Sequence, residues 1–459
     1  MPRLVLSTVL FLVLGLLSWT VHARCEPVAL LIAGEGSVEI RRPEGDFWLP
    51  AAADTPLCAG DQLRTGAHSR ATVRLLAEKT VLRLDQHTAL TLREPRQNRS
   101  WMSLLRGMLH ILSRPPRPLE VETPFVNAGI EGTEFALRVS ADATLIWVFE
   151  GRVRFANTRG DLHLDDGQSA LARRGQAPQL RVNVEQRDAV NWALYYPPIL
   201  DPAAPDDKIT AAARLLGVGR VDEAGALLAE VATDPQALAL QGLIAVVQGD
   251  RQRGLSLARE AIALAPEDPT PRVALSYAAQ ADFDLPTALA AAREATRLAP
   301  DHALAWSRVA ELELARRDLA ASEAAATQAA ELDNSLAGVW TVRGFAALAR
   351  VDLEGARAAF QQASELDPGD PLPRLGLGLA RIRQGELVEG RQHLETAASL
   401  DPNDSLLRSY LGKAYYEEKR DGPAATELAN AKTLDPLDPT PWFYDAIRKQ
   451  SINRPVEAL

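Results

Sequence analysis

The chain has 459 residues, 47% of them hydrophobic and 24% charged, which is too apolar for a disordered protein and long enough for two or more domains. The net charge of −10 is unevenly divided. Residues 24–200 carry 22 Lys or Arg against 21 Asp or Glu, and residues 201–459 carry 27 against 39. Because nucleic acid favours Lys- and Arg-rich surfaces, we expect no nucleic-acid partner for the acidic C-terminal part.

The first 23 residues predict a secretory signal peptide. Arg3 precedes an apolar run from Leu4 to Leu17, and a polar stretch follows that ends at Ala23. Cleavage after Ala23 would leave an exported, periplasmic protein with no membrane span. The alternative is an uncleaved N-terminal anchor, because the eighteen residues from Leu4 to Val21 are a borderline length for crossing a bilayer.

The chain contains two cysteines, Cys25 and Cys58. In an oxidising compartment we expect them to form a disulfide, which would close a loop of moderate length and stabilise the fold by roughly 3–4 kcal/mol. The alternative is two unpaired, buried thiols. Neither cysteine has another Cys or a His at ligand spacing, so we predict no metal site.

Residues 24–186 predict an all-β domain. From Val28 to about Val184 the apolar residues alternate in short runs, as in residues 73–75 and 81–84, and turn residues such as Gly60-Asp61 and Asp166-Gly167 separate the runs. We expect about a dozen short strands in an antiparallel meander, roll or sandwich.

A series of motifs in this region resembles the FecR family of periplasmic regulatory domains. In order, the motifs are Gly36-Ser37-Val38, Trp48, Gly60-Asp61-Gln62-Leu63-Arg64-Thr65-Gly66, Ser69-Arg70-Ala71, Thr123-Pro124, Gly132-Thr133-Glu134-Phe135, Glu150-Gly151-Arg152-Val153 and Gly167-Gln168. We interpret these residues as structural. Trp48 and Phe135 are expected in the core, and Arg70 or Glu134 is expected to pair at a sheet edge.

One departure from the family bears on function. A FecR-type anti-sigma regulator has a cytoplasmic segment ahead of its membrane helix, whereas here only Met1, Pro2 and Arg3 precede the apolar run. The resemblance therefore implies the extracytoplasmic module alone. Its partners would be envelope polysaccharide or envelope proteins.

Residues 187–204 form a linker that is rich in aromatic residues and prolines. Pro197 and Pro198 prevent a continuous helix and predict a stiff, extended spacer. The linker aromatics Trp192, Tyr195 and Tyr196 have two interpretations. They could form a hot spot for a partner, or they could pack the β domain against the first helices and fix the angle between the two parts.

A 34-residue repeat runs through residues 205–459. One register contains Pro266, Pro300, Asn334, Pro368, Pro402 and Pro436, and a second contains Ala261, Ala295, Ala329, Ala363, Ala397 and Ala431. Small residues recur at Ser276, Ala310, Gly344, Gly378 and Gly412, where two helices could approach closely. Acids recur at Asp250, Asp284, Asp318, Asp352 and Glu386, where a carboxylate can cap the second helix of a unit.

This region resembles a tetratricopeptide (TPR) array, whose units are pairs of helices that stack into a solenoid. Trp306, Trp340 and Trp442 stand at the Trp place of that family, Tyr415 at its Tyr place and Phe360 at its Phe place. We predict about seven helix pairs, the last of them truncated.

In TPR proteins the first helix of each pair lines a concave groove. By phase, the groove candidates are Val273, Tyr277, Ser307, Glu311, Thr341, Phe345, Leu375, Leu379, Ser409 and Lys413. The repeated Lys and Asn residues that clamp C-terminal carboxylates in one TPR subgroup are missing here. A groove for an apolar peptide, extended segment or helix fits better, although some of these residues could instead pack against neighbouring units.

The sequence contains no catalytic or cofactor motif that we could identify. A His-Glu-x-x-His zinc motif, a Gly-x-Ser-x-Gly nucleophile elbow and a phosphate-binding loop are all missing. We therefore predict a protein that is not an enzyme and needs no cofactor.

Taken together, these features predict an exported scaffold or adaptor, in which the TPR array binds a protein or peptide and the FecR-like domain binds an envelope component. One alternative is an envelope signal sensor of FecR type without the anti-sigma segment. Another is the N-terminal part of a larger envelope protein, because the repeat carried forward from Ala424 reaches Ala458 and Arg454–Leu459 reads as the start of a further helix.

Overall fold

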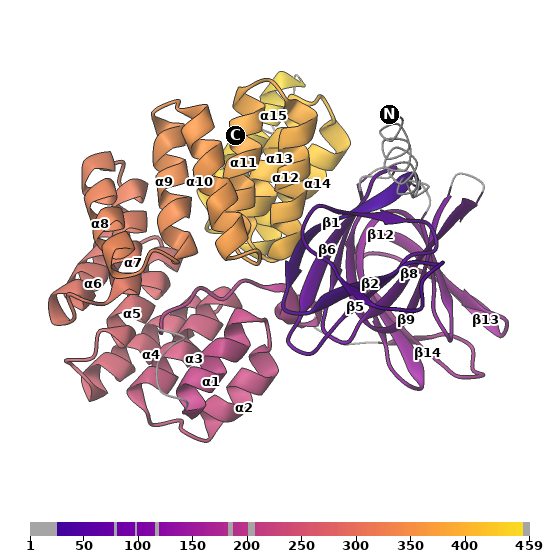
Figure 1. The fold of residues 1–459 in the computed structure, drawn as a ribbon, viewed down its shortest axis with the longest axis horizontal. Coiled ribbons are helices and arrows are strands. Elements are labelled where there is room, and N and C mark those ends of the chain that lie inside the picture. Colours follow the sequence, from indigo (N-terminus) through magenta and orange to yellow (C-terminus); the bar gives the residue numbers. More distant parts are fainter. Residues whose placement is uncertain are drawn as a thin grey trace, which may run out of the picture.

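The computed structural model describes residues 25–77, 80–96, 99–114, 119–181, 187–200 and 207–452. The predicted fold class is confirmed, since an all-β domain precedes an array of α-helix pairs (Figure 1). The predicted signal peptide and the predicted start of a last helix after Arg454 lie outside the described residues.

The β domain is built on one 15-stranded sheet. Its strands are β1 (Pro27–Glu35), β2 (Val38–Arg41), β3 (Leu49–Pro50), β4 (Thr55–Cys58), β5 (Gln62–Thr65), β6 (Arg70–Leu75), β7 (Val81–Leu84), β8 (Ala89–Arg96), β9 (Arg99–Leu112), β10 (Leu119–Glu122), β11 (Asn127–Val139), β12 (Ala143–Asn157), β13 (Gly160–Leu164), β14 (Ser169–Arg173) and β15 (Gln179–Arg181). The pairings are antiparallel except between β9 and β10, which run parallel.

Three long strands fold this sheet over into two layers. Residues 99–106 of β9 pair with β8 and β10, whereas residues 107–112 pair with β7 and β11. At the bend, Gly107 has a φ of 95°, and a Cβ there would lie 2.4 Å from the backbone of Thr88, so only glycine fits. Strands β9, β11 and β12 have 14, 13 and 15 residues, so the prediction of uniformly short strands was wrong for them.

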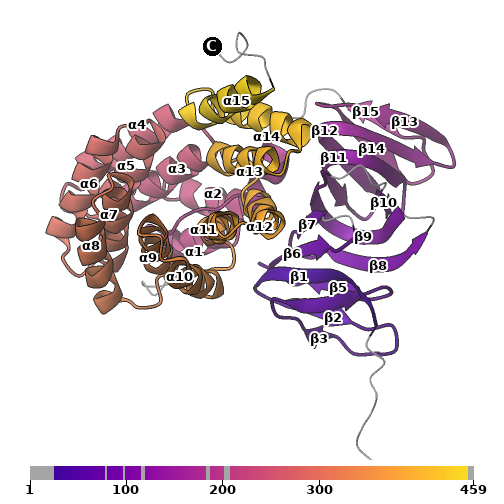
Figure 2. The ribbon, with the colours of Figure 1, turned by 90° about the horizontal axis from the view of Figure 1, so that it is seen from above.

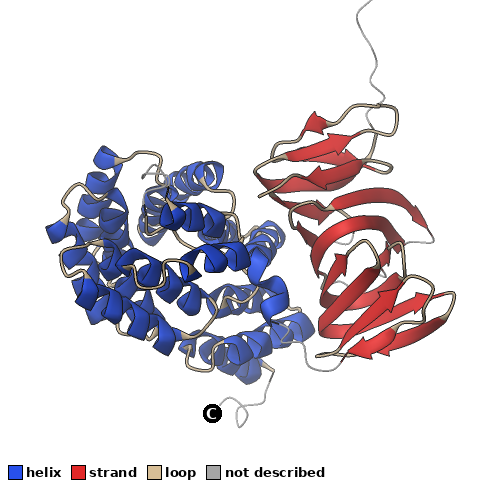
Figure 3. Ribbon diagram, turned by 90° about the horizontal axis from the view of Figure 1, so that it is seen from below, coloured by secondary structure: helices blue, strands red, loops and turns tan. Residues whose placement is uncertain are grey.

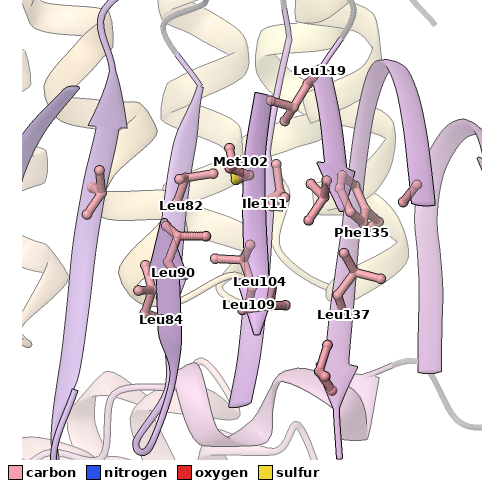
Figure 4. Close-up of a cluster of buried hydrophobic side chains, with 14 of the residues drawn as sticks. Leu82, Leu84, Leu90, Met102, Leu104, Leu109, Ile111, Leu119, Phe135 and Leu137 are labelled. Atoms are coloured by element: carbon pink, nitrogen blue, oxygen red, sulfur yellow. The ribbon is translucent and has the colours of Figure 1, made fainter. Parts of the chain in front are cut away.

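The hydrophobic core lies between the two layers. Leu82, Leu109 and Phe135 are fully buried there, and Figure 4 shows them among the side chains that point inward from neighbouring strands. The prediction for Phe135 is confirmed. The one for Trp48 was wrong: its ring is half-buried at the surface, with the Arg64 guanidinium 4.2 Å from the ring centroid, because a stacked guanidinium satisfies the ring face without burial.

The array begins after a short 3-10 helix, η1 (Arg187–Ala193), and an irregular segment. Its helices are α1 (Lys208–Gly217), α2 (Val221–Ala229), α3 (Pro235–Val247), α4 (Arg251–Leu264), α5 (Thr270–Ala281), α6 (Leu285–Leu298), α7 (Ala303–Ala315), α8 (Leu319–Leu332), α9 (Ala337–Ala349), α10 (Leu353–Leu366), α11 (Pro371–Arg383), α12 (Leu387–Leu400), α13 (Ser405–Glu417), α14 (Asp421–Leu434) and α15 (Pro439–Ser451). They form seven pairs followed by α15.

The predicted helix caps are confirmed at four of five places. Asp250, Asp284, Asp318 and Asp352 each accept a hydrogen bond from the backbone N–H three residues on. Glu386 was predicted to do the same but makes no such bond, because its longer side chain pairs with Arg381 instead. The small residues act as expected: a Cβ on Gly412 would lie 2.8 Å from the Leu428 side chain of the paired helix.

The array makes nearly a full superhelical turn. Arg251 at the start of α4 donates a hydrogen bond of 2.5 Å to Asp435, which follows α14. Figure 2 shows the curved array with the β domain against one side of it. Figure 3 shows helices and strands separated into two halves of the molecule.

The turns inside the helix pairs share a left-handed residue, and this generates a prediction about stability. Residues of positive φ recur at Gly249, Phe283, Arg317, Val351, Gly385 and Lys419. Left-handed backbone is costly for a β-branched side chain. Because Val351 is 65% exposed, Val351→Asn should stabilise the protein by about 0.5–1 kcal/mol, measured by urea unfolding.

The matched control is the equivalent turn of the next pair. A Cβ on Gly385 would meet nothing within 4 Å, so Gly385→Val changes only backbone strain and should cost about 1–2 kcal/mol. Equal stability of the two variants and the parent protein would contradict the strain argument.

Candidate functional site: the junction of sheet, linker and array

The outer face of one sheet layer carries a row of polar side chains that meets the array. Arg83 on β7 lies opposite His110 on β9, which lies opposite Ala136 on β11, so their side chains share one face. Helix α12 packs against β6 and β7 on this face. Arg74 on β6 donates a hydrogen bond of 2.6 Å to Thr396 on α12. The sheet therefore meets the array through charged residues.

A buried cluster of charges lies at the centre of this junction. The Glu134 carboxylate on β11 accepts hydrogen bonds of 2.8 and 2.5 Å from Arg408 on α13, and one of 3.1 Å from Arg114. Arg114 also donates a bond of 2.5 Å to Glu427 on α14, which is 3.2 Å from Arg408. His110 lies 3.0 Å from Glu134. Two guanidinium groups and two carboxylates therefore alternate across the domain boundary.

Burial and pairing act in opposite directions on these groups. Burial alone would raise the pKa of Glu134, but Arg408, His110 and Arg114 together hold that pKa well below its usual value. Glu150 on β12 is in the opposite situation. Burial raises its pKa to about 7, although Arg114 lies 2.9 Å away, because Glu427 and Glu134 also raise it. Glu134 is thus ionised near neutral pH, whereas Glu150 titrates there.

Arg70 links the sheet, the linker and the first helix. Its Nε donates a bond of 2.7 Å to Glu35, one NH group donates to the Trp192 carbonyl at 3.1 Å, and the other donates to the Gly217 carbonyl at 3.2 Å. We expected Arg70 or Glu134 to pair at a sheet edge, and this was wrong. Both lie on strands with neighbours on each side. The array supplies Arg408 to Glu134 in addition to Arg114 and His110 of the β domain, and the linker and α1 complete the partners of Arg70.

The linker aromatics lie inside the junction. Trp192 packs with Met108, Ala136 and Trp147 of the sheet. Tyr196 is buried among residues of the first helices. Tyr195 donates from its hydroxyl to Asp367 at 3.0 Å and from its amide to Asp401 at 3.3 Å. The linker is therefore part of the interface, while its role as a partner hot spot stays a prediction.

The ten groove candidates lie on the first helices of pairs three to seven, as their positions in the 34-residue repeat predicted. Five are buried, namely Val273, Ser307, Thr341, Leu375 and Ser409, and five are half-buried, namely Tyr277, Glu311, Phe345, Leu379 and Lys413. Arg308 stacks on Tyr277 at 3.7 Å, and Phe345 packs edge-on against Phe360. Their contact with a partner stays a prediction.

Sequence reasoning missed Arg374 and Arg408, although a signal was available. Both stand at the Trp place of the repeat, 34 and 68 residues after Trp340. Trp340 donates its ring N–H to the carbonyl six residues earlier. Arg408 makes the equivalent bond, because its Nε donates to the carbonyl of Pro402 at 3.1 Å. The other guanidinium nitrogens of Arg408 reach the β domain, and Arg374 donates to the Ile32 carbonyl at 3.1 Å. Arg at the Trp place thus marks two of the repeats that contact the sheet.

Cys25 and Cys58 form a disulfide, with their Cα atoms 6.1 Å apart. This bond joins the residues before β1 to the end of β4. Within the described ranges, no group of three or more His, Cys, Asp or Glu residues could hold a metal ion. None of the helices described is both long and apolar enough to cross a bilayer.

A surface cavity of about 830 Å³ lies on the other layer of the β domain. Arg152 and Arg154 line it, but each is already paired, with Asp165 at 2.8 Å and with Asp161 at 3.5 Å. Exposed ion pairs of this kind are typical of a solvated surface. We assign no chemistry to this cavity.

Comparisons with known families agree with this architecture. Residues 61–154 match the family described as FecR protein, and residues 347–409 match a family of tetratricopeptide repeats. The chain therefore contains a FecR-like domain followed by TPR repeats. No curated protein matches the chain at a significant level.

Several solved structures are similar to parts of the chain. The match to a chain of the Cut9–Hcn1 hetero-tetramer of the APC/C covers 56% of this chain and 50% of that chain, with 14% sequence identity and a TM-score of 0.43. This chain therefore spans half the length of that relative. An anti-sigma factor structure from Parabacteroides distasonis ATCC 8503 matches 30% of this chain and 68% of its own, with 14% identity and a TM-score of 0.27. The match to the TPR protein YrrB covers 40% of this chain and 95% of that chain, with 18% sequence identity and a TM-score of 0.25.

Breaking the buried charge cluster should be costly. Arg408→Met leaves the Glu134 carboxylate buried without its main partner, and we expect a loss of about 3–5 kcal/mol in the free energy of unfolding. The double variant Glu134→Met, Arg408→Met removes both charges and should recover at least about 1 kcal/mol of the summed single losses.

Urea unfolding of the four proteins in this cycle measures the coupling. The control is Arg297→Met, which breaks an exposed pair with Glu294 and should cost no more than about 0.5 kcal/mol. Additive losses at positions 134 and 408 would show that the cluster does not hold the domains together.

The stability of the junction should also depend on pH. Between about pH 4.5 and 7 the folded protein keeps a proton on Glu150 that the unfolded chain releases, because the folded pKa is about 7 and the ordinary value is 4.5. The free energy of unfolding should therefore fall as pH rises through this range, by up to about 3 kcal/mol from this group.

Glu150→Gln isolates that contribution. Urea unfolding at pH 5.5 and 7.5 should show a smaller pH dependence in this variant than in the parent protein, because the amide does not titrate. An unchanged pH dependence would show that Glu150 is not the group that titrates.

Proposed function

We propose that this protein is a non-enzymatic, exported adaptor of the cell envelope. Its TPR array binds a protein or peptide partner, and its FecR-like domain contacts an envelope component. The observation that supports this best is the buried junction between the two parts. Because Glu134 pairs with Arg408 and Arg114 pairs with Glu427 across it, a partner held by one domain has a fixed position relative to the other.

Export is supported by the signal-like residues 1–23 and by the cysteine pair. A tagged full-length chain in a Gram-negative host should be recovered from the periplasm. It should also show no maleimide-reactive thiol before reduction, since both cysteines are in the disulfide. A cytoplasmic protein with two reactive thiols would refute the export part of the proposal.

Partner binding can be tested in the full-length protein by photo-crosslinking. A crosslinking amino acid replaces Val351, which is 65% exposed on a turn of the array, or Phe47, which is 81% exposed on the β domain. In the native cells we expect a specific protein adduct from position 351. The adaptor proposal fails if neither position gives a reproducible adduct.

An envelope sensor is the second candidate function, and Glu150 favours it. A carboxyl with a pKa of about 7 at the boundary between the domains would couple their contact to the pH of the compartment. A partner whose crosslinking yield changes between pH 6 and 8 in the parent protein, but not in Glu150→Gln, would support the sensor over the adaptor.

A further inference from the structure

The inner wall of the array is formed by the first helices of successive pairs. Helices α1 and α3 contact each other, as do α3 and α5, α7 and α9, α9 and α11, and α11 and α13. The predicted groove residues, including Val273 on α5, belong to these helices. A peptide partner of a TPR array would therefore be expected along this wall.

Part of that wall is already covered by the chain itself. Leu194, Tyr196, Ile199 and Leu200 of the linker are buried in one apolar cluster with residues of α1, α3 and α5, among them Val273. Residues 194–200 contain no helix or strand, and Pro197 and Pro198 stand in their middle. The segment is bound as an extended peptide would be, with apolar side chains against the helices.

Tyr195 fixes the same segment to the opposite part of the array. Its hydroxyl donates to Asp367 before α11, and its amide donates to Asp401 before α13. Burial and the carboxylates of Asp367 and Asp370 raise the pKa of Tyr195 well above its usual value, so the phenol keeps the proton that it donates. The carboxylates of Asp367 and Asp401 thus accept one hydrogen bond from the side chain of Tyr195 and one from its backbone.

The β domain holds this segment in place. Arg70 donates to the carbonyls of Trp192 at 3.1 Å and Leu194 at 3.5 Å. Gly219, in the turn between α1 and α2, lies against the same backbone, and a Cβ there would be only 2.2 Å from the Trp192 oxygen. The linker can leave the wall only if these contacts are released.

We propose that the inner wall is a peptide site occupied by the chain's own residues 194–200. A protein partner enters it with an extended segment of the same chemistry, in which aromatic and branched aliphatic side chains stand next to prolines. The site opens only when the contacts of Arg70 and Gly219 with the linker are lost. This inference rests on the proposed function, in which the array binds a protein partner.

The test uses full-length protein and a fluorescent peptide with the sequence of residues 192–200, Trp-Ala-Leu-Tyr-Tyr-Pro-Pro-Ile-Leu. Gly219→Ala should push the linker off the wall, whereas Gly249→Ala is the matched control. Gly249 has the same left-handed backbone in the turn of the next pair, with nothing within 4 Å of a Cβ. Fluorescence anisotropy should show at least tenfold tighter binding to Gly219→Ala than to the parent protein or Gly249→Ala.

Hydrogen exchange reports whether the linker has moved. The inference is overturned if the linker amides of Gly219→Ala exchange faster but the peptide binds no more tightly, or if a peptide with both tyrosines replaced by serine binds equally well. If hydrogen exchange shows that the linker amides of Gly219→Ala are still protected, Tyr196→Asp is used in its place, because a carboxylate cannot stay in the apolar cluster. Peptide binding to Tyr196→Asp is then compared with binding to the parent protein. If a variant is destabilised but still folded, a rise in its melting temperature on adding the peptide supports the site, and no rise overturns it.

Failure of this inference can be distinguished from failure of the adaptor proposal. Adducts from position 351 that persist while the peptide fails to bind the opened array would place the partner on another surface of the array. Loss of both results would reject the two proposals together.

Discussion

The pairing of Glu134 with Arg408 is the constraint on which the arrangement of this molecule depends. Both groups are about 3% exposed, and a charge buried to that extent is tolerated only when it is paired and hydrogen-bonded. One partner comes from β11 and the other from α13. Arg114 and His110 also pair with Glu134, and Glu427 also pairs with Arg408, but the shortest contacts of the Glu134 carboxylate are those to Arg408 across the boundary. Separation of the domains would break the Glu134–Arg408 and Arg114–Glu427 pairs, and these charges would keep only the partners within their own domain. The sheet and the array are for this reason one unit.

The other contacts of the junction follow from that pairing. With the sheet held against α12 and α13, Arg70 can reach the linker and α1 at once, and Tyr195 can reach the loops before α11 and α13. The linker is short, so its path is confined to the space between the two parts. Residues expected to form a spacer therefore pack against the first helices of the array, in the apolar cluster to which the groove candidates Val273 and Tyr277 belong.

The sequence was most informative where structure repeats. Capping by Asp284 or Asp352 and close approach at Gly412 depend on neighbours within one helix pair, so a 34-residue period was enough to predict them. The junction could not be predicted in this way, because Glu134 and Arg408 are 274 residues apart and no local pattern links them. Trp48 illustrates a second limit: whether an aromatic ring enters the core or stacks on Arg64 depends on the fold of the whole domain.

Residues that depart from the repeat pattern indicate where the array contacts the rest of the molecule. Trp306, Trp340 and Trp442 each donate one ring N–H to a carbonyl six residues earlier, which completes the helix pair and leaves nothing polar to offer outside it. Arginine at the same place can make this bond and still donate elsewhere, as Arg408 does to Glu134. Replacing Trp by Arg therefore keeps the pair intact while giving it an outward contact. In a solenoid, where each unit packs only on its neighbours, such replacements are where contacts beyond the array should be sought first.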